Sequence, residues 1–211
     1  TFNNNVLDAT QAWTKLLASA TQLPGVPATL LEPMREAASA REQEGYLLTL
    51  DMPCYTAVLA YCEDQDIRKE LYLAYGTRAS DRGPNAGEFD NTVVMQEILA
   101  ARLRQATLLG FENFAEFSVA TKMARSGQEV LDFLADLGRQ AQPAATRELA
   151  QIEEFAAAEG MVIPLEPWDI AFCAQKLKKS SYDLSDEELR PYFPVDRVLA
   201  GMFEVVKRLF D

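Results

Sequence analysis

Histidine is absent from this sequence of 211 residues. The absence excludes a Ser-His-Asp triad, a Cys-His pair and any zinc site that depends on imidazole ligands. Cysteine is scarce, since the chain has only Cys54, Cys62 and Cys173. An odd and sparse set of cysteines argues against a disulfide framework and favours a reducing compartment, so we expect a cytoplasmic protein.

Long apolar runs and excess positive charge are missing as well. No stretch approaches the roughly 20 apolar residues that a membrane helix needs, so the sequence predicts no transmembrane segment. Acidic residues outnumber basic ones by 32 to 20, which gives a formal net charge of −12. Because such a chain repels phosphate groups, nucleic acid and anionic membranes are poor candidate partners. The hydrophobic content of 48% is ordinary for a folded globular protein.

Helical spacing of apolar residues dominates what is present, and it predicts an all-α fold of about nine or ten helices. The first apolar stripe consists of Val6, Ala9, Trp13, Leu16 and Ala20. Further helices are predicted near residues 28–43, 53–62, 66–79, 91–109, 113–121, 127–160, 168–182 and 195–210. The last of these is apolar around most of its circumference, so we expect it to be deeply buried.

Local signals mark the limits of the C-terminal helices. Ser126 and Glu129 form a capping box at the start of the long helix, and Ser185 and Glu188 form a second one. Pro143 lacks a backbone N–H and clashes with the preceding turn, so it is expected to kink or break the long helix. We interpret residues 1–211 as one helical segment, with a possible subdivision into residues 1–125 and 126–211.

One segment departs from the helical pattern. Residues 46–50 are aromatic and aliphatic, lie between Gly45 and Pro53, and predict a short strand. A strand must pair its backbone groups with a neighbour. Residues 161–163 are the one candidate partner within the chain, and a weak one, so we expect the strand to pair with residues that the chain does not contain.

The most polar and glycine-rich stretch is the loop of residues 76–87. Its Arg78 and Arg82 are candidate substrate-binding residues, because a guanidinium pairs with a carboxylate such as a peptide C-terminus. The alternative is a structural turn in which both arginines pair with local acids, and it is favoured because most charges serve solvation. The sequence predicts no catalytic residue.

Other clusters have simpler explanations. Cys54 and Cys62 have the wrong spacing for a zinc knuckle, and small buried side chains are the better interpretation. Three acidic clusters favour helix-dipole and surface roles over metal binding or acid–base chemistry; they are residues 63–64, 153–154 and 186–188. Five tyrosines are candidates for a peptide groove, although packing is favoured; they are Tyr46, Tyr55, Tyr61, Tyr72 and Tyr75.

Several short sequence segments occur in the same order as in a known protein family. They are residues 2–10, 44–51, 77–81, 83–87, 109–113, 167–171, 189–194 and 203–208. Through these segments the chain resembles the thimet-oligopeptidase family of zinc metallopeptidases over nearly its whole length. Several matching segments in the same order identify a family more specifically than any single motif does.

The resemblance implies a largely helical, two-lobed enzyme with a deep channel that admits short peptides and excludes folded proteins. The family binds zinc on a His-Glu-x-x-His helix with a further Glu ligand, and the motif Glu activates the metal-bound water. Since this chain has no histidine, no catalytic or metal-ligating residue is carried over to it. The resemblance therefore implies that the chain is an internal segment of such an enzyme. The catalytic part would follow residue 211, and strands of that part would pair with strand 46–50.

Three hypotheses follow. The first is a non-catalytic helical part of a zinc-dependent oligopeptidase, which forms channel wall, supports the catalytic lobe and binds no zinc itself. Its partners would be short peptides and the catalytic part, with self-association through exposed apolar surface. The second is a free-standing acidic helical module that binds a protein partner. A helical enzyme with a carboxylate-bound metal ranks last, because no Glu-x-x-His pair is visible.

Overall fold

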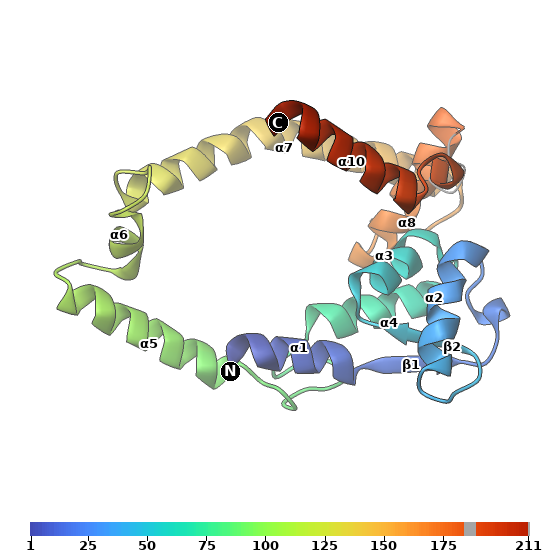
Figure 1. The fold of residues 1–211 in the computed structure, drawn as a ribbon, viewed down its shortest axis with the longest axis horizontal. Helices are drawn as coiled ribbons and strands as arrows, with labels where there is room; N and C mark the ends of the chain where they lie inside the picture. Colours follow the sequence, from blue (N-terminus) through green and yellow to red (C-terminus); the bar gives the residue numbers. More distant parts are fainter. Residues whose placement is uncertain (184–188, 211) are drawn as a thin grey trace.

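The computed structural model describes residues 1–183 and 189–210 and confirms a mostly helical chain (Figure 1). The predicted capping box at residues 185–188 lies outside the described residues. The elements in chain order are α1 (Phe2–Ala12), β1 (Thr14–Leu17), η1 (Ala20–Gln22), α2 (Ala28–Ser39), β2 (Tyr46–Thr49), α3 (Met52–Tyr61), α4 (Gln65–Gly76), α5 (Thr92–Leu108), α6 (Phe114–Val119), α7 (Gly127–Ala158), α8 (Pro167–Tyr182), η2 (Arg190–Tyr192) and α10 (Val195–Phe210).

The first helix is shorter than its apolar stripe predicts. Helix α1 ends at Ala12, and strand β1 follows directly after Trp13. Side chains four residues apart lie on the same side of a helix and also of a strand, so the spacing of Trp13 and Leu17 fits both. Trp13 and Leu17 are buried in the core, whereas Leu16, a member of the predicted stripe, is exposed. Pairing with another strand therefore decided the conformation of this segment.

That other strand is β2, which confirms the predicted strand near residues 46–50. Strands β1 and β2 are antiparallel, with Thr14 opposite Thr49 and Leu17 opposite Tyr46. The expectation that the chain holds no good partner for this strand was wrong, because the helical interpretation of residues 14–17 hid the partner. Residues 161–163 are not part of this sheet.

The main core lies where α2, α3 and α4 meet the two-stranded sheet. Its largest fully buried apolar side chains are Leu23, Leu48, Leu50, Val58 and Leu71. Helix α8 packs against α3 and α4, although it follows them by about a hundred residues in the chain. A second, smaller cluster joins the end of α7 to α8 through Ala156, Phe172 and Cys173. Helix α8 thus connects the two clusters.

Helices α5, α6 and α7 leave this body and return to it as an arm (Figure 1). The Ser126 hydroxyl accepts a hydrogen bond from the Glu129 N–H at 3.1 Å, which confirms the Ser126 half of the predicted capping box, while the Glu129 carboxylate accepts from the Arg125 N–H instead. Of the two outcomes predicted at Pro143, a kink or a break, the break was wrong, since α7 continues through this residue. Proline removes one backbone hydrogen bond, and the alanine, glutamine and glutamate residues around it are strong helix formers that maintain the rest.

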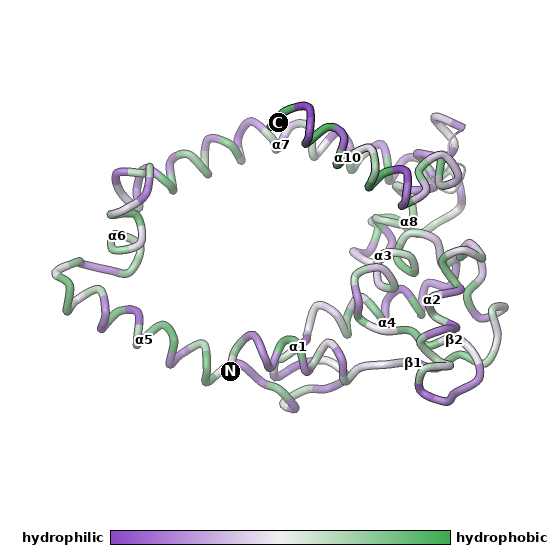
Figure 2. The backbone as a smooth tube through the Cα atoms, viewed as in Figure 1, coloured by the Kyte–Doolittle hydropathy of each residue, from purple (hydrophilic) through white to green (hydrophobic). Residues whose placement is uncertain are grey.

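Helix α10 contradicts the prediction of deep burial, because none of its residues is buried. Phe203 and Phe210 are 65% and 83% exposed. The helix is amphipathic rather than apolar all round, and its polar side carries the ion pair of Arg208 with Glu204. Figure 2 shows apolar positions recurring along α5, α7 and α10. Within the described residues, no helix combines the length and the apolar character that crossing a membrane requires.

Candidate functional site

Arg78 lies just after the last turn of α4, at the start of the loop that leads to α5. The carbon of its guanidinium is 3.4 Å from the centre of the Tyr75 ring. Its Nη1 donates a hydrogen bond to the Thr10 hydroxyl at 3.1 Å, and that hydroxyl donates to the Val6 carbonyl at 2.7 Å. Helices α4 and α1 therefore hold this side chain from two sides.

No carboxylate in the described part of the chain pairs with Arg78. Its Nε is buried and has no hydrogen-bond acceptor there. A cation that is partly removed from water without a counter-ion is costly unless other contacts compensate. The Tyr75 ring provides one such contact through its negative face.

Arg82, the second predicted arginine, has a different environment. Its side chain is exposed and makes no hydrogen bond, ion pair or ring contact with the described residues. Its backbone N–H donates to the Ser80 hydroxyl at 3.2 Å, which helps to shape the loop. The structure therefore gives Arg78 a defined position and leaves Arg82 free in solvent.

Asn91 anchors the far end of the same loop and was missed by sequence reasoning. Its side chain is buried, donates to the Phe2 carbonyl at 3.1 Å and accepts from Asn5 at 2.9 Å. Its backbone N–H donates to the Ala79 carbonyl at 3.0 Å, next to Arg78. A single asparagine before a helix gives no sign of its side-chain contacts, because the partners of that side chain are more than eighty residues away in sequence.

Four half-buried aromatic side chains from three helices form what we term the aromatic row. They are Tyr55 of α3, Tyr72 and Tyr75 of α4, and Trp168 of α8. The Tyr55 and Tyr75 rings stack at 4.2 Å, and the Tyr72 and Trp168 rings meet edge to face at 6.1 Å. Burial raises the pKa of Tyr55, the neighbouring Tyr72 and Tyr75 raise it further, and Arg78 lowers it.

The aromatic row thus contains three of the five tyrosines that were candidates for a peptide groove, with packing the favoured alternative. Tyr46 instead lies in β2, and Tyr61 accepts a hydrogen bond from Gln175 at 3.1 Å. Trp168 was missed, because a tryptophan at the start of a helix carries no signal of the tyrosines that it meets. Its indole N–H is buried and has no acceptor among the described residues, and the Lys69 ammonium lies 5.2 Å from the ring centre.

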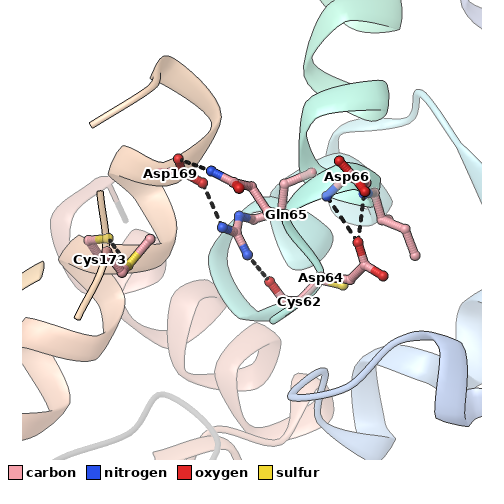
Figure 3. Close-up of polar contacts among 9 residues, drawn as sticks. Cys62, Asp64, Gln65, Asp66, Asp169 and Cys173 are labelled. Carbon is pink, nitrogen blue, oxygen red and sulfur yellow. Dashed lines mark hydrogen bonds and ion pairs between the residues drawn. The ribbon is translucent and has the colours of Figure 1, made fainter. Parts of the chain in front are cut away.

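A buried ion pair between α4 and α8 supports the aromatic row (Figure 3). Arg68 Nη2 lies 2.6 Å from Asp169 Oδ1, and the two side chains are 1% and 3% exposed. Gln65 donates to the other carboxylate oxygen of Asp169 at 2.8 Å, and Arg68 also donates to the Cys62 carbonyl at 2.6 Å. Because Asp169 adjoins Trp168 in the chain, this ion pair fixes the part of α8 that carries Trp168.

The cysteine and acidic side chains are the candidate metal ligands of this chain. In the residues that the structure describes, no three or more Cys, Asp and Glu side chains come together in a way that could hold a metal ion. Burial raises the pKa of Cys54, Cys62 and Cys173, which favours the protonated thiols over the thiolates that bind metals. Asp64 caps α4 with its side chain, as expected for the first acidic cluster. The residues present do not fit a zinc ion.

Comparison with known proteins identifies the family. Residues 58–211 match the sequence profile of peptidase family M3. The chain belongs to this family. It is 55% identical to oligopeptidase A of Salmonella typhimurium and 54% identical to that of Escherichia coli, in each case over 99% of this chain and 31% of the relative. A probable thimet oligopeptidase of Arabidopsis thaliana is 28% identical over 90% of the chain and 25% of the relative.

The M3 assignment confirms the family resemblance that the ordered sequence segments indicated. The similarity to oligopeptidase A extends over 99% of the chain. The chain spans about a third of the length of the oligopeptidase A relatives, 31% in both bacteria. The Arg78 loop and the aromatic row belong to the M3 part of the chain, apart from Tyr55, which precedes residue 58.

Proposed function

We propose that this chain is a non-catalytic helical part of a zinc-dependent oligopeptidase that hydrolyses short peptides. Within that enzyme it forms channel wall and supports the catalytic lobe. The observation that carries the proposal is the match to oligopeptidase A over 99% of this chain but only 31% of the relative. Short peptides and the catalytic part of the enzyme are its partners.

Zinc belongs to the enzyme and not to this part of it. The chain has no histidine, and its described residues hold no metal-binding cluster. The chain alone is therefore inactive in this proposal. A cytoplasmic location is supported by free Cys54, Cys62 and Cys173, which fit a reducing compartment.

The alternative of a free-standing acidic interaction module is less well supported. Large apolar side chains are exposed on three helices, for example Leu99 on α5, Phe133 on α7 and Phe203 on α10, each about two-thirds exposed. A monomeric soluble module rarely exposes contiguous apolar surface on this scale. Part of a larger enzyme has the rest of that enzyme to cover it.

A peptidase assay tests the proposal. The 211-residue chain and the longer protein encoded by the same reading frame are each incubated with a quenched fluorescent short peptide, with zinc and with a chelator. We expect zinc-dependent cleavage by the longer protein, a His-Glu-x-x-His motif beyond residue 211, and no cleavage by the chain alone. Metal-dependent turnover by the chain alone that survives purification, or a longer protein without peptidase activity, would contradict the proposal.

A further inference from the structure

We propose that Arg78 binds a carboxylate of a peptide that lies along the aromatic row. The inference rests on the proposed function, because it assigns the peptide to the oligopeptidase as substrate. It goes further in naming a binding residue, the chemical group that it recognises and the surface that receives the rest of the peptide.

The first argument is the unused bonding capacity of Arg78. A guanidinium has five N–H groups in a rigid fork that matches the two oxygens of a carboxylate. One of them donates to Thr10, and the described residues provide no further acceptor and no counter-ion. In a chain with 32 acidic residues, a half-buried arginine without an acidic partner indicates that its partner is supplied from outside these residues.

The second argument is that Arg78 is held in place before any ligand arrives. The Tyr75 ring and the Thr10 hydroxyl hold the guanidinium, and Asn91 ties the loop to α1. A side chain that is already fixed loses little conformational entropy on binding, so more of the contact energy appears as affinity. A solvation role requires none of these contacts, as exposed Arg82 shows.

The third argument is where the unsatisfied donors lie. Three buried side-chain N–H groups lack an acceptor in the described part of the chain, and they belong to Arg68, Arg78 and Trp168. Arg78 contacts Tyr75 and Trp168 contacts Tyr72, so two of these donors adjoin rings of the aromatic row, whereas Arg68 is fully buried in its pair with Asp169. Because more than about 90% of buried polar groups in proteins are paired, the unpaired N–H of Arg78 indicates an acceptor that the described residues do not supply.

The fourth argument is the character of the aromatic side chains near Arg78. Tyrosine and tryptophan rings offer flat apolar faces together with polar edges, which suits the mixed surface of an extended peptide. The faces of the Tyr75 ring are taken by Arg78 and by the stacked Tyr55 ring, so the half-buried Tyr72 and Trp168 are the rings left to receive a peptide. A peptide whose carboxylate reaches Arg78 would therefore lie on aromatic side chains.

Peptide binding to the longer protein, with its metal removed by a chelator so that no peptide is consumed, tests the inference. The probe is a short peptide labelled at its N-terminus, with either a free C-terminal carboxylate or a C-terminal amide. We expect the carboxylate form to bind at least about tenfold more tightly, as a charge-assisted hydrogen bond predicts. Arg78→Met abolishes this preference, Arg78→Lys keeps part of it, and Arg82→Met, the matched control on the same loop, leaves it unchanged.

Two results would overturn the inference. One is equal binding of the carboxylate and amide peptides to the unchanged protein. The other is a preference that survives in Arg78→Met, because another group of the enzyme would then recognise the carboxylate. Failure of the proposed function is a separate outcome, because a protein without peptidase activity can still bind the carboxylate peptide through Arg78.

Discussion

At the scale of single residues, the pair of Arg68 and Asp169 is buried and therefore sensitive to the loss of either partner. Removing two charges from water is costly, and only their mutual attraction and the added hydrogen bonds offset the cost. Here Gln65 and the Cys62 carbonyl provide those bonds. Replacement of one partner leaves the other charge buried without compensation.

We therefore expect Asp169→Asn to lower the free energy of unfolding by about 3–5 kcal/mol. Glu204→Gln, which removes an exposed ion pair with Arg208, is the control and should cost no more than about 0.5 kcal/mol. Urea denaturation followed by circular dichroism measures both. Similar losses for the two variants would show that the buried pair does not stabilise the packing of α4 against α8.

A second residue-scale prediction concerns the glycines of the Arg78 loop. Gly83 and Gly87 both have positive φ angles, 86° and 79°. A Cβ added at Gly83 would overlap the Thr77 side chain, whose hydroxyl donates to the Leu73 carbonyl at 2.6 Å, whereas a Cβ at Gly87 meets open space. Both variants suffer the backbone penalty of about 1–2 kcal/mol for an L-residue in this region.

Gly83→Ala should therefore destabilise the protein by about 1 kcal/mol more than Gly87→Ala, since only the former also displaces Thr77. Thermal melting of the two variants gives the comparison. Equal melting temperatures would mean that the loop yields at Gly83 without disturbing α4.

At the scale of secondary-structure elements, the pairing of β1 with β2 organises the N-terminal half. Leu48 is fully buried on one side of β2, whereas Leu16 of β1 is 44% exposed on the other side, where the opposite residue Leu47 is buried. A change of the same chemistry at these two positions therefore has very different consequences.

Leu48→Asp is expected to cost about 4 kcal/mol or more, because it places a carboxylate in the core without a partner. Leu16→Asp in the paired strand should cost about 1 kcal/mol or less, since Leu16 is 44% exposed. Chemical denaturation of both variants tests the difference in burial between the two positions. A larger effect at Leu16 would contradict the exposed position of its side chain.

At the scale of the whole molecule, the chain is far more open than a compact monomer. Its accessible surface is 14710 Å². A compact protein of 23.5 kDa would expose about 9800 Å². The excess lies in part on the arm of α5, α6 and α7 and on α10, which carry many of the exposed large apolar side chains.

Alone in solution, the chain should therefore bind an apolar-surface dye and associate with itself as its concentration rises. Dye fluorescence and sedimentation across a concentration series measure the two effects. Changing Leu199 and Val206 of α10 together to Gln should reduce dye binding, whereas Glu204→Gln on the polar side should not. A monomer without dye binding would instead favour the free-standing module.

Local chemistry determined much of this protein without reference to its tertiary structure. Apolar spacing and the cap at Ser126 defined most helices, because those signals act within a few turns. The lack of histidine excluded a zinc site built on imidazoles. Short sequence segments in a characteristic order indicated the family. Arg78 was a candidate from its position in a polar, glycine-rich loop alone.

Tertiary structure decided what depends on partners distant in sequence. The strand conformation of residues 14–17 required β2, and the burial of Arg68 and Asp169 required each other across 101 residues. The difference between Arg78 and Arg82 arose from Tyr75 and Thr10, which no local pattern connects to the loop. Helix α10 stays exposed for the same reason, since an amphipathic pattern specifies a face to bury but not the element that covers it.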